Sequence, residues 1–480
     1  MDFLKVSKEK IVNQTDSPVT LRGVCVGGFM NLEDFINGYS GTESNLRGNL
    51  TKVLGDKLSD YFFEQMADQF FNEEDIAFLS GLGANCIRMP LNYRHFEDDL
   101  VPFKYKEKGF QRLDHIIDLC EAYGIYVILD MHSVPGWQNC HWHSDNERGA
   151  NLLWTHKHFQ DRLVGLWEEF ARRYHNRSIV AGYDLMNEPS TGNPSGEHGF
   201  DFYEHYNSNW NMLNEIYQRI ITAIRVIDQK HIIFLEGDNY ARNFDGLSAS
   251  TDQNVAYSSH NYTAPSWGPK PYPGEFMNAT WNKETHEKAF LEHEGTVLAK
   301  KHQVPLWVGE FGSQYLGPVE QVPYRLQSMD DQLDVYSKYD IHFTTWTYKD
   351  AGVMGLVTLD PESEYIKLIK PIQDKKKILG CENFVALFEK CPGREKSKEL
   401  ADLILQVTDL PDIKESTVSY SFDTAALNGY AAATLQISYI NLWKGMTEAD
   451  IKRIMEAFRF KNCKINQPFL EILKKHFAAV

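Results

Sequence analysis

Polar and aromatic side chains stand at the ends of several short apolar runs in this sequence. Glu188 closes one run, behind Asn187, and Glu310 closes another more than a hundred residues later. Two carboxyl groups brought face to face can cleave a glycosidic bond, one by protonating the leaving oxygen and the other by attacking the anomeric carbon. Further runs end in Arg88, His132, His260, Tyr262 and Trp346.

These apolar runs are rich in β-branched residues and alternate with stretches of helical periodicity, which indicates repeated βα units and a parallel sheet. A helix is predicted over 159–174, where Leu163, Leu166, Trp167 and Phe170 recur on one face. Eight strands are predicted, over 19–28, 84–90, 125–132, 179–189, 231–237, 255–262, 304–312 and 341–348.

Eight βα repeats predict an α/β fold, the (β/α)8 TIM barrel, because a closed parallel barrel leaves no strand edge unpaired. Such barrels carry their catalytic groups at the carboxyl ends of the strands, so the polar endings should meet at one mouth. The long connections 29–72 and 133–158 leave from the same end and are expected to shape the pocket. We assign residues 1–377 to the catalytic barrel and 378–480 to a C-terminal, mainly helical extension.

The C-terminal extension contains amphipathic segments. One of them has a Thr447-x-x-Asp450 capping signal, followed by an apolar stripe of Ile451, Ile454, Met455 and Phe458. A stripe of this kind more often packs on a core than joins two subunits. Packing on the barrel is therefore the first expectation, and a homo-oligomer is the alternative.

The charge balance limits the classes of partner. A formal charge of −17 repels nucleic acid and anionic bilayers at long range, so a small neutral ligand fits better than either. The first residues lack the apolar segment of a signal peptide, and no later run approaches the roughly 20 apolar residues of a spanning helix. We therefore expect a cytoplasmic protein that has no membrane or nucleic-acid partner.

Cysteine and histidine spacing gives little support for a bound metal. The seven cysteines include no CxxC pair, so we expect neither a disulfide framework nor a thiolate zinc site. His141 and His143 have an HxH spacing, but barrel metallohydrolases carry that pair after the first strand, where this sequence reads CVGG. We expect no metal and no cofactor.

Each polar strand ending, taken alone, has an ordinary explanation as a solvated carboxylate or a satisfied buried histidine. Taken together they resemble glycoside hydrolase family 5 over roughly residues 18–360. The motifs that carry the resemblance are Asn187-Glu188-Pro189, Gly309-Glu310-Phe311-Gly312, His260-Asn261-Tyr262, Arg88 and Trp346.

The resemblance implies a retaining β-glycosidase. Glu188 would be the general acid/base, with a raised pKa while it holds the proton for the leaving group, and Glu310 would be the nucleophile. Arg88 and Tyr262 would keep Glu310 ionised and in place. Asn187 would bind the sugar 2-hydroxyl.

The remaining candidates would contact the rest of the substrate. His132 and His260 would reach other hydroxyls or nearby carboxylates, and Trp346 would stack on the apolar face of a pyranose. Trp137 and His143 belong to the loop GWQNCHWHSDNERG, which is expected to wall off one end of the cleft.

Substrate choice rests on the expected location and on resemblance. A cytoplasmic enzyme meets short imported oligosaccharides, which favours exo action. The stretches HSDNERGA, TWTYKDAGVMG and GVCVGGFMNLEDFINGYSG resemble a subgroup of β-mannosidases that act on short mannosides, including mannosyl-β-1,4-N-acetylglucosamine. The alternatives are a β-1,4-glucanase or glycolipid β-glucosidase of the same family and, in another class, an inert carbohydrate-binding barrel. The presence of both glutamates argues against the inert barrel.

Overall fold

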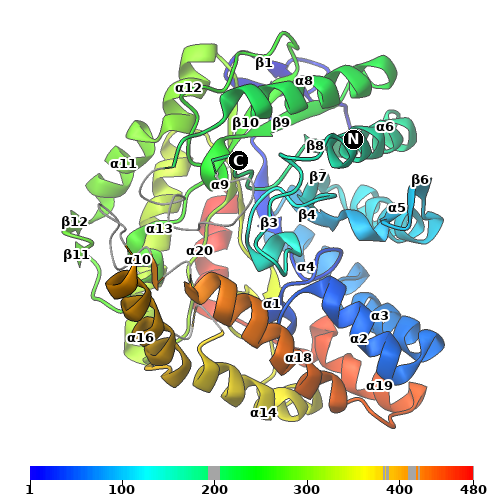
Figure 1. Ribbon diagram of the computed structural model, residues 1–480. Helices are drawn as coiled ribbons and strands as arrows, with labels where there is room; N and C mark the ends of the chain where they lie inside the picture. The colour runs from blue at the N-terminus through cyan, green and yellow to red at the C-terminus, as the bar shows by residue number, and fades with distance from the viewer. Residues whose placement is uncertain are drawn as a thin grey trace.

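A closed barrel of eight parallel strands forms the centre of the molecule (Figure 1). The computed structural model describes residues 1–192, 206–381, 384, 387, 389–408, 418–419 and 422–478. Each barrel strand overlaps one of the predicted runs, which confirms the TIM barrel. The strands are β3 (Arg22–Cys25), β4 (Cys86–Asn92), β7 (Tyr126–Ser133), β8 (Val180–Asp184), β9 (Ile232–Glu236), β10 (Val255–His260), β13 (Leu306–Glu310) and β14 (His342–Thr345).

The barrel closes where β14 pairs with β3, with Phe343 opposite Arg22. On its other side β3 pairs with β4, with Gly23 opposite Cys86. A Cβ atom at Gly23 would lie 1.7 Å from the backbone oxygen of Cys86. Only glycine therefore allows these two strands to come together, and the closure depends on it.

Helices surround the barrel (Figure 1). Between consecutive strands lie α4 (Glu73–Leu82), α5 (Glu107–Tyr123), α6 (Lys157–Tyr174), α8 (Trp210–Ile227), α9 (Asp238–Ala241), α10 (Ala264–Trp267), α11 (Lys283–Glu292), α12 (Glu294–His302) and α13 (Val322–Lys338). The predicted helix over 159–174 is α6, and all four residues of its apolar stripe are buried. Burial of such a stripe against the strands is the main source of stability for a surface helix.

The amino-terminal end of the barrel is filled with apolar side chains. A hairpin of β1 (Lys5–Ser7) and β2 (Lys10–Val12) places Leu4 and Ile11 in one buried cluster with Phe234 and Trp307. This end of the barrel is therefore a packed core, and the polar groups are left to the opposite end.

Both long connections contain structure of their own. The connection after β3 holds α1 (Asp34–Asn37), α2 (Glu43–Leu54) and α3 (Asp56–Phe70). The connection after β7 holds a short 3-10 helix, Trp142–Ser144. Smaller additions are the hairpins β5 (Glu97–Asp98) with β6 (Val101–Tyr105) and β11 (Gly274–Phe276) with β12 (Ala279–Trp281).

The C-terminal segments pack along one side of the barrel. They comprise α14 (Glu364–Leu379), α16 (Pro392–Val407), a π-helical turn (Asp423–Ala431), α18 (Ala432–Asn441), α19 (Glu448–Met455) and α20 (Gln467–Phe477). The predicted capping box at Thr447 and Asp450 is present, and all four residues of the apolar stripe behind it are buried. The domain boundary after residue 377 stays a prediction. It falls inside α14.

A small sheet joins the end of the barrel to the C-terminal segments. In it β16 (Val357–Leu359) pairs with β15 (Lys349–Asp350) on one side and with β17 (Cys463–Ile465) on the other. The seven cysteines are free thiols, as expected. Across the described ranges, no helix has both the length and the apolar character that crossing a bilayer requires.

Lys349 connects three distant segments through a fully buried ammonium group. Its Nζ lies 2.5 Å from Asp75 Oδ1 and donates hydrogen bonds to the backbone oxygens of Phe70, at 2.6 Å, and Phe458, at 2.9 Å. Lys349→Met keeps the apolar stem but removes the only cation paired with the buried Asp75 carboxylate in the described structure, and it removes a donor from two backbone oxygens. We expect this change to lower the free energy of unfolding by about 3–5 kcal/mol, measured by denaturant titration.

The matched control is Lys338→Met, which removes a partly exposed lysine paired with Glu287. Its expected cost is under about 1 kcal/mol. Equal costs for the two variants would contradict the assigned importance of the buried ammonium group.

Candidate active site

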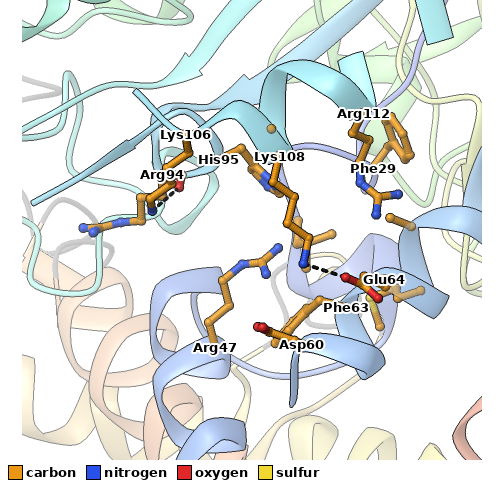
Figure 2. A pocket seen from close by; sticks show the side chains of 14 residues that line it. Phe29, Arg47, Asp60, Phe63, Glu64, Arg94, His95, Lys106, Lys108 and Arg112 are labelled. Carbon is orange, nitrogen blue, oxygen red and sulfur yellow. Dashed lines mark hydrogen bonds and ion pairs between the residues drawn. The ribbon is translucent and has the colours of Figure 1, made fainter. Parts of the chain in front are cut away.

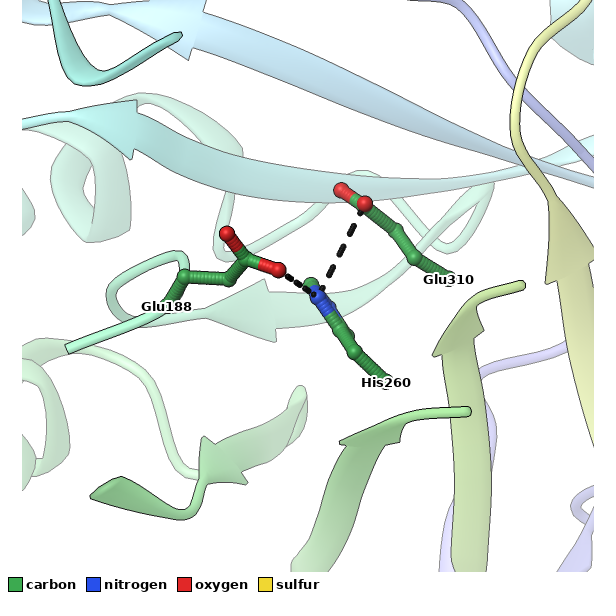
Figure 3. Close-up of side chains that lie close together, drawn as sticks. All are labelled: Glu188, His260 and Glu310. Atoms are coloured by element: carbon green, nitrogen blue, oxygen red, sulfur yellow. Dashed lines mark hydrogen bonds and ion pairs between the residues drawn. The ribbon is translucent and has the colours of Figure 1, made fainter. Parts of the chain in front are cut away.

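Glu188 follows β8 and Glu310 ends β13, and the two meet at the carboxyl end of the barrel with His260 between them (Figure 3). One carboxylate oxygen from each glutamate and one ring nitrogen of His260 all lie within 4.8 Å of one another. Direct attack on an anomeric carbon needs carboxyl groups about 5 Å apart, whereas activation of an intervening water needs about 6.5–9.5 Å. The arrangement fits direct attack.

The Glu310 carboxylate is held by two buried donors. Arg88 Nη1 donates to Oε1 at 2.5 Å, and the Tyr262 hydroxyl donates to Oε2 at 2.9 Å. Glu310 itself is 5% exposed. Both oxygens are thus fixed in orientation by groups that also balance the negative charge, as a nucleophile requires.

Arg88 is fully buried and contacts more acids than the sequence motifs indicated. It donates to Asp184 Oδ2 from Nε, at 3.1 Å, and from Nη2, at 3.0 Å. Nη2 also lies 3.1 Å from Glu236 Oε1 and 3.2 Å from Asp130 Oδ2. Burial by itself lowers the pKa of Arg88, but the surrounding carboxylates, Asp130 first, raise it well above its usual value.

Asp130, Asp184 and Glu236 lie on the three consecutive strands β7, β8 and β9 and were not among the site residues predicted from the sequence. Their signal was an acid inside an otherwise apolar run, as in ILDMH, GYDLM and IFLEG. Burial, together with the charge of Glu236, raises the pKa of Asp184 well above its usual range.

Glu188 is paired with His260. Nδ1 of His260 lies 2.7 Å from Glu188 Oε1, and its Nε2 lies 3.2 Å from Glu236 Oε1. Burial lowers the pKa of His260, but the nearby carboxylates, Glu236 first, raise it well above its ordinary value. The imidazole is therefore protonated.

The raised pKa expected for Glu188 is wrong for this arrangement. Burial raises the pKa of the carboxyl, but the hydrogen bond and charge of His260 outweigh burial, and the pKa lies well below its usual range. The pair therefore carries one proton, on His260 Nδ1 and 2.7 Å from the carboxylate. General acid action at Glu188 requires that this proton moves to the carboxyl oxygen.

Asn187 and His132 lie next to each other beside the two glutamates. The Asn187 Oδ1 accepts from Arg88 Nη2 at 2.7 Å, and its Nδ2 lies 3.4 Å from His132 Nε2. Nδ1 of His132 lies 2.7 Å from Asp130 Oδ2. Although burial lowers the pKa of His132, the charge of Asp130 and this hydrogen bond raise it to about 10. His132 is therefore a cation at neutral pH.

Trp346 follows β14 and is 5% exposed. The ring of His132 lies parallel to it, with centroids 5.5 Å apart and an interplanar angle of 4°. One face of the indole is thus already covered by a cationic ring. A sugar could therefore stack only on the opposite face of the Trp346 indole, and this contact stays a prediction.

The connection after β7 contacts Glu188. Asn139 Nδ2 donates to the backbone oxygen of Glu188 at 2.9 Å, and His143 Nε2 lies 3.4 Å from Glu188 Oε2. Burial lowers the pKa of His143, so this imidazole is neutral. The indole N–H of Trp137 donates to the backbone oxygen of Asp145, a contact inside the connection. Its substrate role stays a prediction.

Among the residues that the structure describes, two groups of side chains have the spacing of metal ligands. One is Glu188, His260 and Glu310, where a protonated imidazole already supplies the positive charge. The other is Asp330, Asp334 and His476, where the Nζ of Lys475 lies 2.9 Å from Asp330 Oδ1 and 2.8 Å from Asp334 Oδ1. In both groups an ammonium or imidazolium group fills the place of a cation.

A separate pocket of about 290 Å³ lies outside the mouth, beside α2, α3 and α5 (Figure 2). Basic side chains line it, but each of the following is paired with an acid: Arg47 with Glu43, Lys108 with Glu64, and Arg112 with Asp68. The positive charge of this pocket is therefore largely compensated.

Comparison with known proteins gives consistent results. Residues 39–352 match the family model described as Cellulase (glycosyl hydrolase family 5). The chain is 34% identical to a beta-xylosidase of Phanerodontia chrysosporium, over 96% of both chains. It is 29% identical to Cellodextrinase A of Ruminococcus flavefaciens, over 53% of this chain and 71% of that protein. The solved structure of an endogalactoceramidase matches with a TM-score of 0.52 at 18% identity, over 73% of this chain and 75% of that chain, which supports the fold alone.

The shared proton of Glu188 and His260 predicts a change in pH dependence. In His260→Asn, Glu188 alone must hold the proton for the leaving group, and it loses that proton at lower pH than His260 does. We expect the basic limb of the kcat/KM profile on an aryl β-glycoside to move down by about one pH unit or more. His286→Asn removes a buried histidine bonded to Ser328 and should leave the limb in place. An unmoved limb in His260→Asn would contradict the proton assignment.

Proposed function

The chain belongs to glycosyl hydrolase family 5 and is an O-glycosyl hydrolase, and we propose that it cleaves β-glycosides with retention by double displacement. The observation that carries this proposal is the pair of carboxylates within 4.8 Å at one barrel mouth. In this proposal Glu310 is the nucleophile and Glu188 the general acid/base.

In the first step a Glu310 oxygen attacks the anomeric carbon from the face opposite the aglycone. The bond to the glycosidic oxygen breaks, and Glu188 gives that oxygen the proton drawn from His260. The product is an α-linked glycosyl ester on Glu310. In the second step Glu188 takes a proton from water and returns it to His260, the water oxygen attacks the same carbon, and Glu310 leaves as a carboxylate. Two inversions restore the β configuration.

The surrounding groups support both steps. Arg88 and Tyr262 each bind one oxygen of the Glu310 carboxylate, so the carboxylate stays oriented for attack on the anomeric carbon. Asn187, held by Arg88, is placed to bond the sugar 2-hydroxyl, an interaction that strengthens as positive charge develops at the anomeric carbon.

Two glycones are supported by different observations. The sequence stretches around the mouth favour a β-mannoside. The relative that matches over 96% of both chains is named a beta-xylosidase, which favours a β-xyloside. Because this similarity includes the C-terminal segments as well as the barrel, we rank the β-xyloside first. Exo action on short oligosaccharides and a cytoplasmic location stay predictions from the sequence.

Substitution of the two glutamates tests the mechanism. Glu310→Ala should lower kcat/KM by roughly 10³-fold or more on every substrate. Glu188→Ala should keep activity on aryl glycosides with good leaving groups, because these need no proton, and azide should restore turnover with a β-glycosyl azide as product. The exposed Glu320→Ala is the control and should match the wild type. An α-azide product from Glu188→Ala would reverse the assigned roles.

A panel of 4-nitrophenyl β-xyloside, β-mannoside and β-glucoside tests the glycone. We expect the xyloside or the mannoside to give a kcat/KM at least about tenfold above that of the glucoside, because a pocket shaped for one sugar disfavours the others. A preference for the glucoside would reject both candidates. Turnover of any member would dismiss the inert carbohydrate-binding barrel.

A further inference from the structure

The connection after β3 brings one more carboxyl group to the mouth, at Glu33. We propose that Glu33 binds the glycone by accepting a hydrogen bond from the sugar 4-hydroxyl, and that it thereby closes the cleft beyond a single terminal sugar. This inference rests on the proposed function, because it names the residue that would select the end of the substrate chain.

Glu33 directly precedes α1 and is 3% exposed. Its Oε1 lies 3.4 Å from His132 Nε2, a long ion-pair contact, and this oxygen has no well-aligned hydrogen-bond donor among the residues that the structure describes. A buried carboxylate oxygen without a hydrogen bond is unusual in a folded protein and requires an explanation. A substrate hydroxyl would supply the missing donor.

The order of Asn187, His132 and Glu33 along the mouth matches the order of three neighbouring hydroxyls around a pyranose ring. His132 Nε2 lies 3.4 Å from Asn187 Nδ2 on one side and 3.4 Å from Glu33 Oε1 on the other. With the 2-hydroxyl at Asn187, the 3-hydroxyl falls beside His132 and the 4-hydroxyl beside Glu33. A β-1,4-linked chain continues through that oxygen, and a glycosidic oxygen has no hydrogen to donate, so this contact favours a terminal sugar.

The backbone around Glu33 is fixed before substrate arrives. The amide of Leu32 donates to Glu43 Oε2 at 2.8 Å, and the hydroxyl of Tyr39 donates to the oxygen of Leu32 at 3.0 Å. C-terminal helices hold the same segment, since Lys376 Nζ lies 3.0 Å from Asp34 Oδ2. A rigid segment of this kind suits a specificity residue.

Glu33 is buried to a degree similar to that of Glu188 and Glu310. The side chain of Glu33 is 4% exposed, beside 6% for Glu310 and 13% for Glu188. Burial raises the pKa of Glu33 to about 7, against the lowering influence of His132. Near neutral pH the carboxyl of Glu33 can therefore both gain and lose a proton.

Deoxy substrates separate a glycone contact from a purely structural role. We would measure kcat/KM of the wild type, Glu33→Gln and Glu33→Ala on 4-nitrophenyl β-xyloside and β-mannoside and on their 4-deoxy analogues. Glu33→Ala should lose about 100-fold or more on the parent sugars and less than about threefold on the analogues, which lack the bonded hydroxyl. Glu33→Gln keeps an acceptor oxygen and should lie between the two.

The matched control is Asp228→Asn, which breaks another buried carboxylate–histidine pair, with Asp228 Oδ2 2.5 Å from His231 Nδ1. It lies at the amino end of the barrel and should affect parent and analogue equally. If Glu33→Ala lost kcat/KM equally on the parent sugars and on their 4-deoxy analogues, or lost none on either, the proposal would be overturned. If the wild type does not hydrolyse the aryl glycosides, the same comparison can be made by calorimetry. The measurement is then the affinity of the wild type and of Glu33→Ala for intact xylobiose and mannobiose.

Discussion

The mouth of this barrel depends on one buried positive charge. Arg88 contacts acids from four other strands, and without it their mutual repulsion and desolvation would be strongly unfavourable. The guanidinium group is suited to this place, because it cannot lose its proton and offers five donors in a fixed plane. Glu310 is thus held as part of a cluster whose geometry the barrel strands set.

The two catalytic candidates differ in their partners. Glu310 is bonded to an arginine and a tyrosine, neither of which supplies a proton readily near neutral pH. Glu188 is bonded to a protonated histidine, whose proton is held at hydrogen-bond distance. In a pair of carboxyl groups, such a difference in environment separates nucleophile from acid. The low pKa of Glu188 in this structure means that the proton is stored on its neighbour.

The C-terminal segments support the mouth from outside. Gln436 of α18 donates to the backbone oxygens of Ser40, at 2.7 Å, and Thr42, at 3.0 Å, in the same connection that carries Glu33. Lys349 joins the end of the barrel to the backbone of Phe458. These contacts connect the last hundred residues to the pocket without placing any of their own side chains beside Glu188 or Glu310 in the described structure.

The sequence by itself determined the barrel and most of its catalytic candidates. Strand periodicity located all eight strands, and polar endings such as Asn187-Glu188 and Glu310 marked the mouth, because both signals are local. It did not reveal Asp130, Asp184, Glu236 or Glu33, nor the low pKa of Glu188. Each of these depends on contacts between residues far apart in the chain, which only barrel closure and the folding of the first connection bring within a few ångströms of one another.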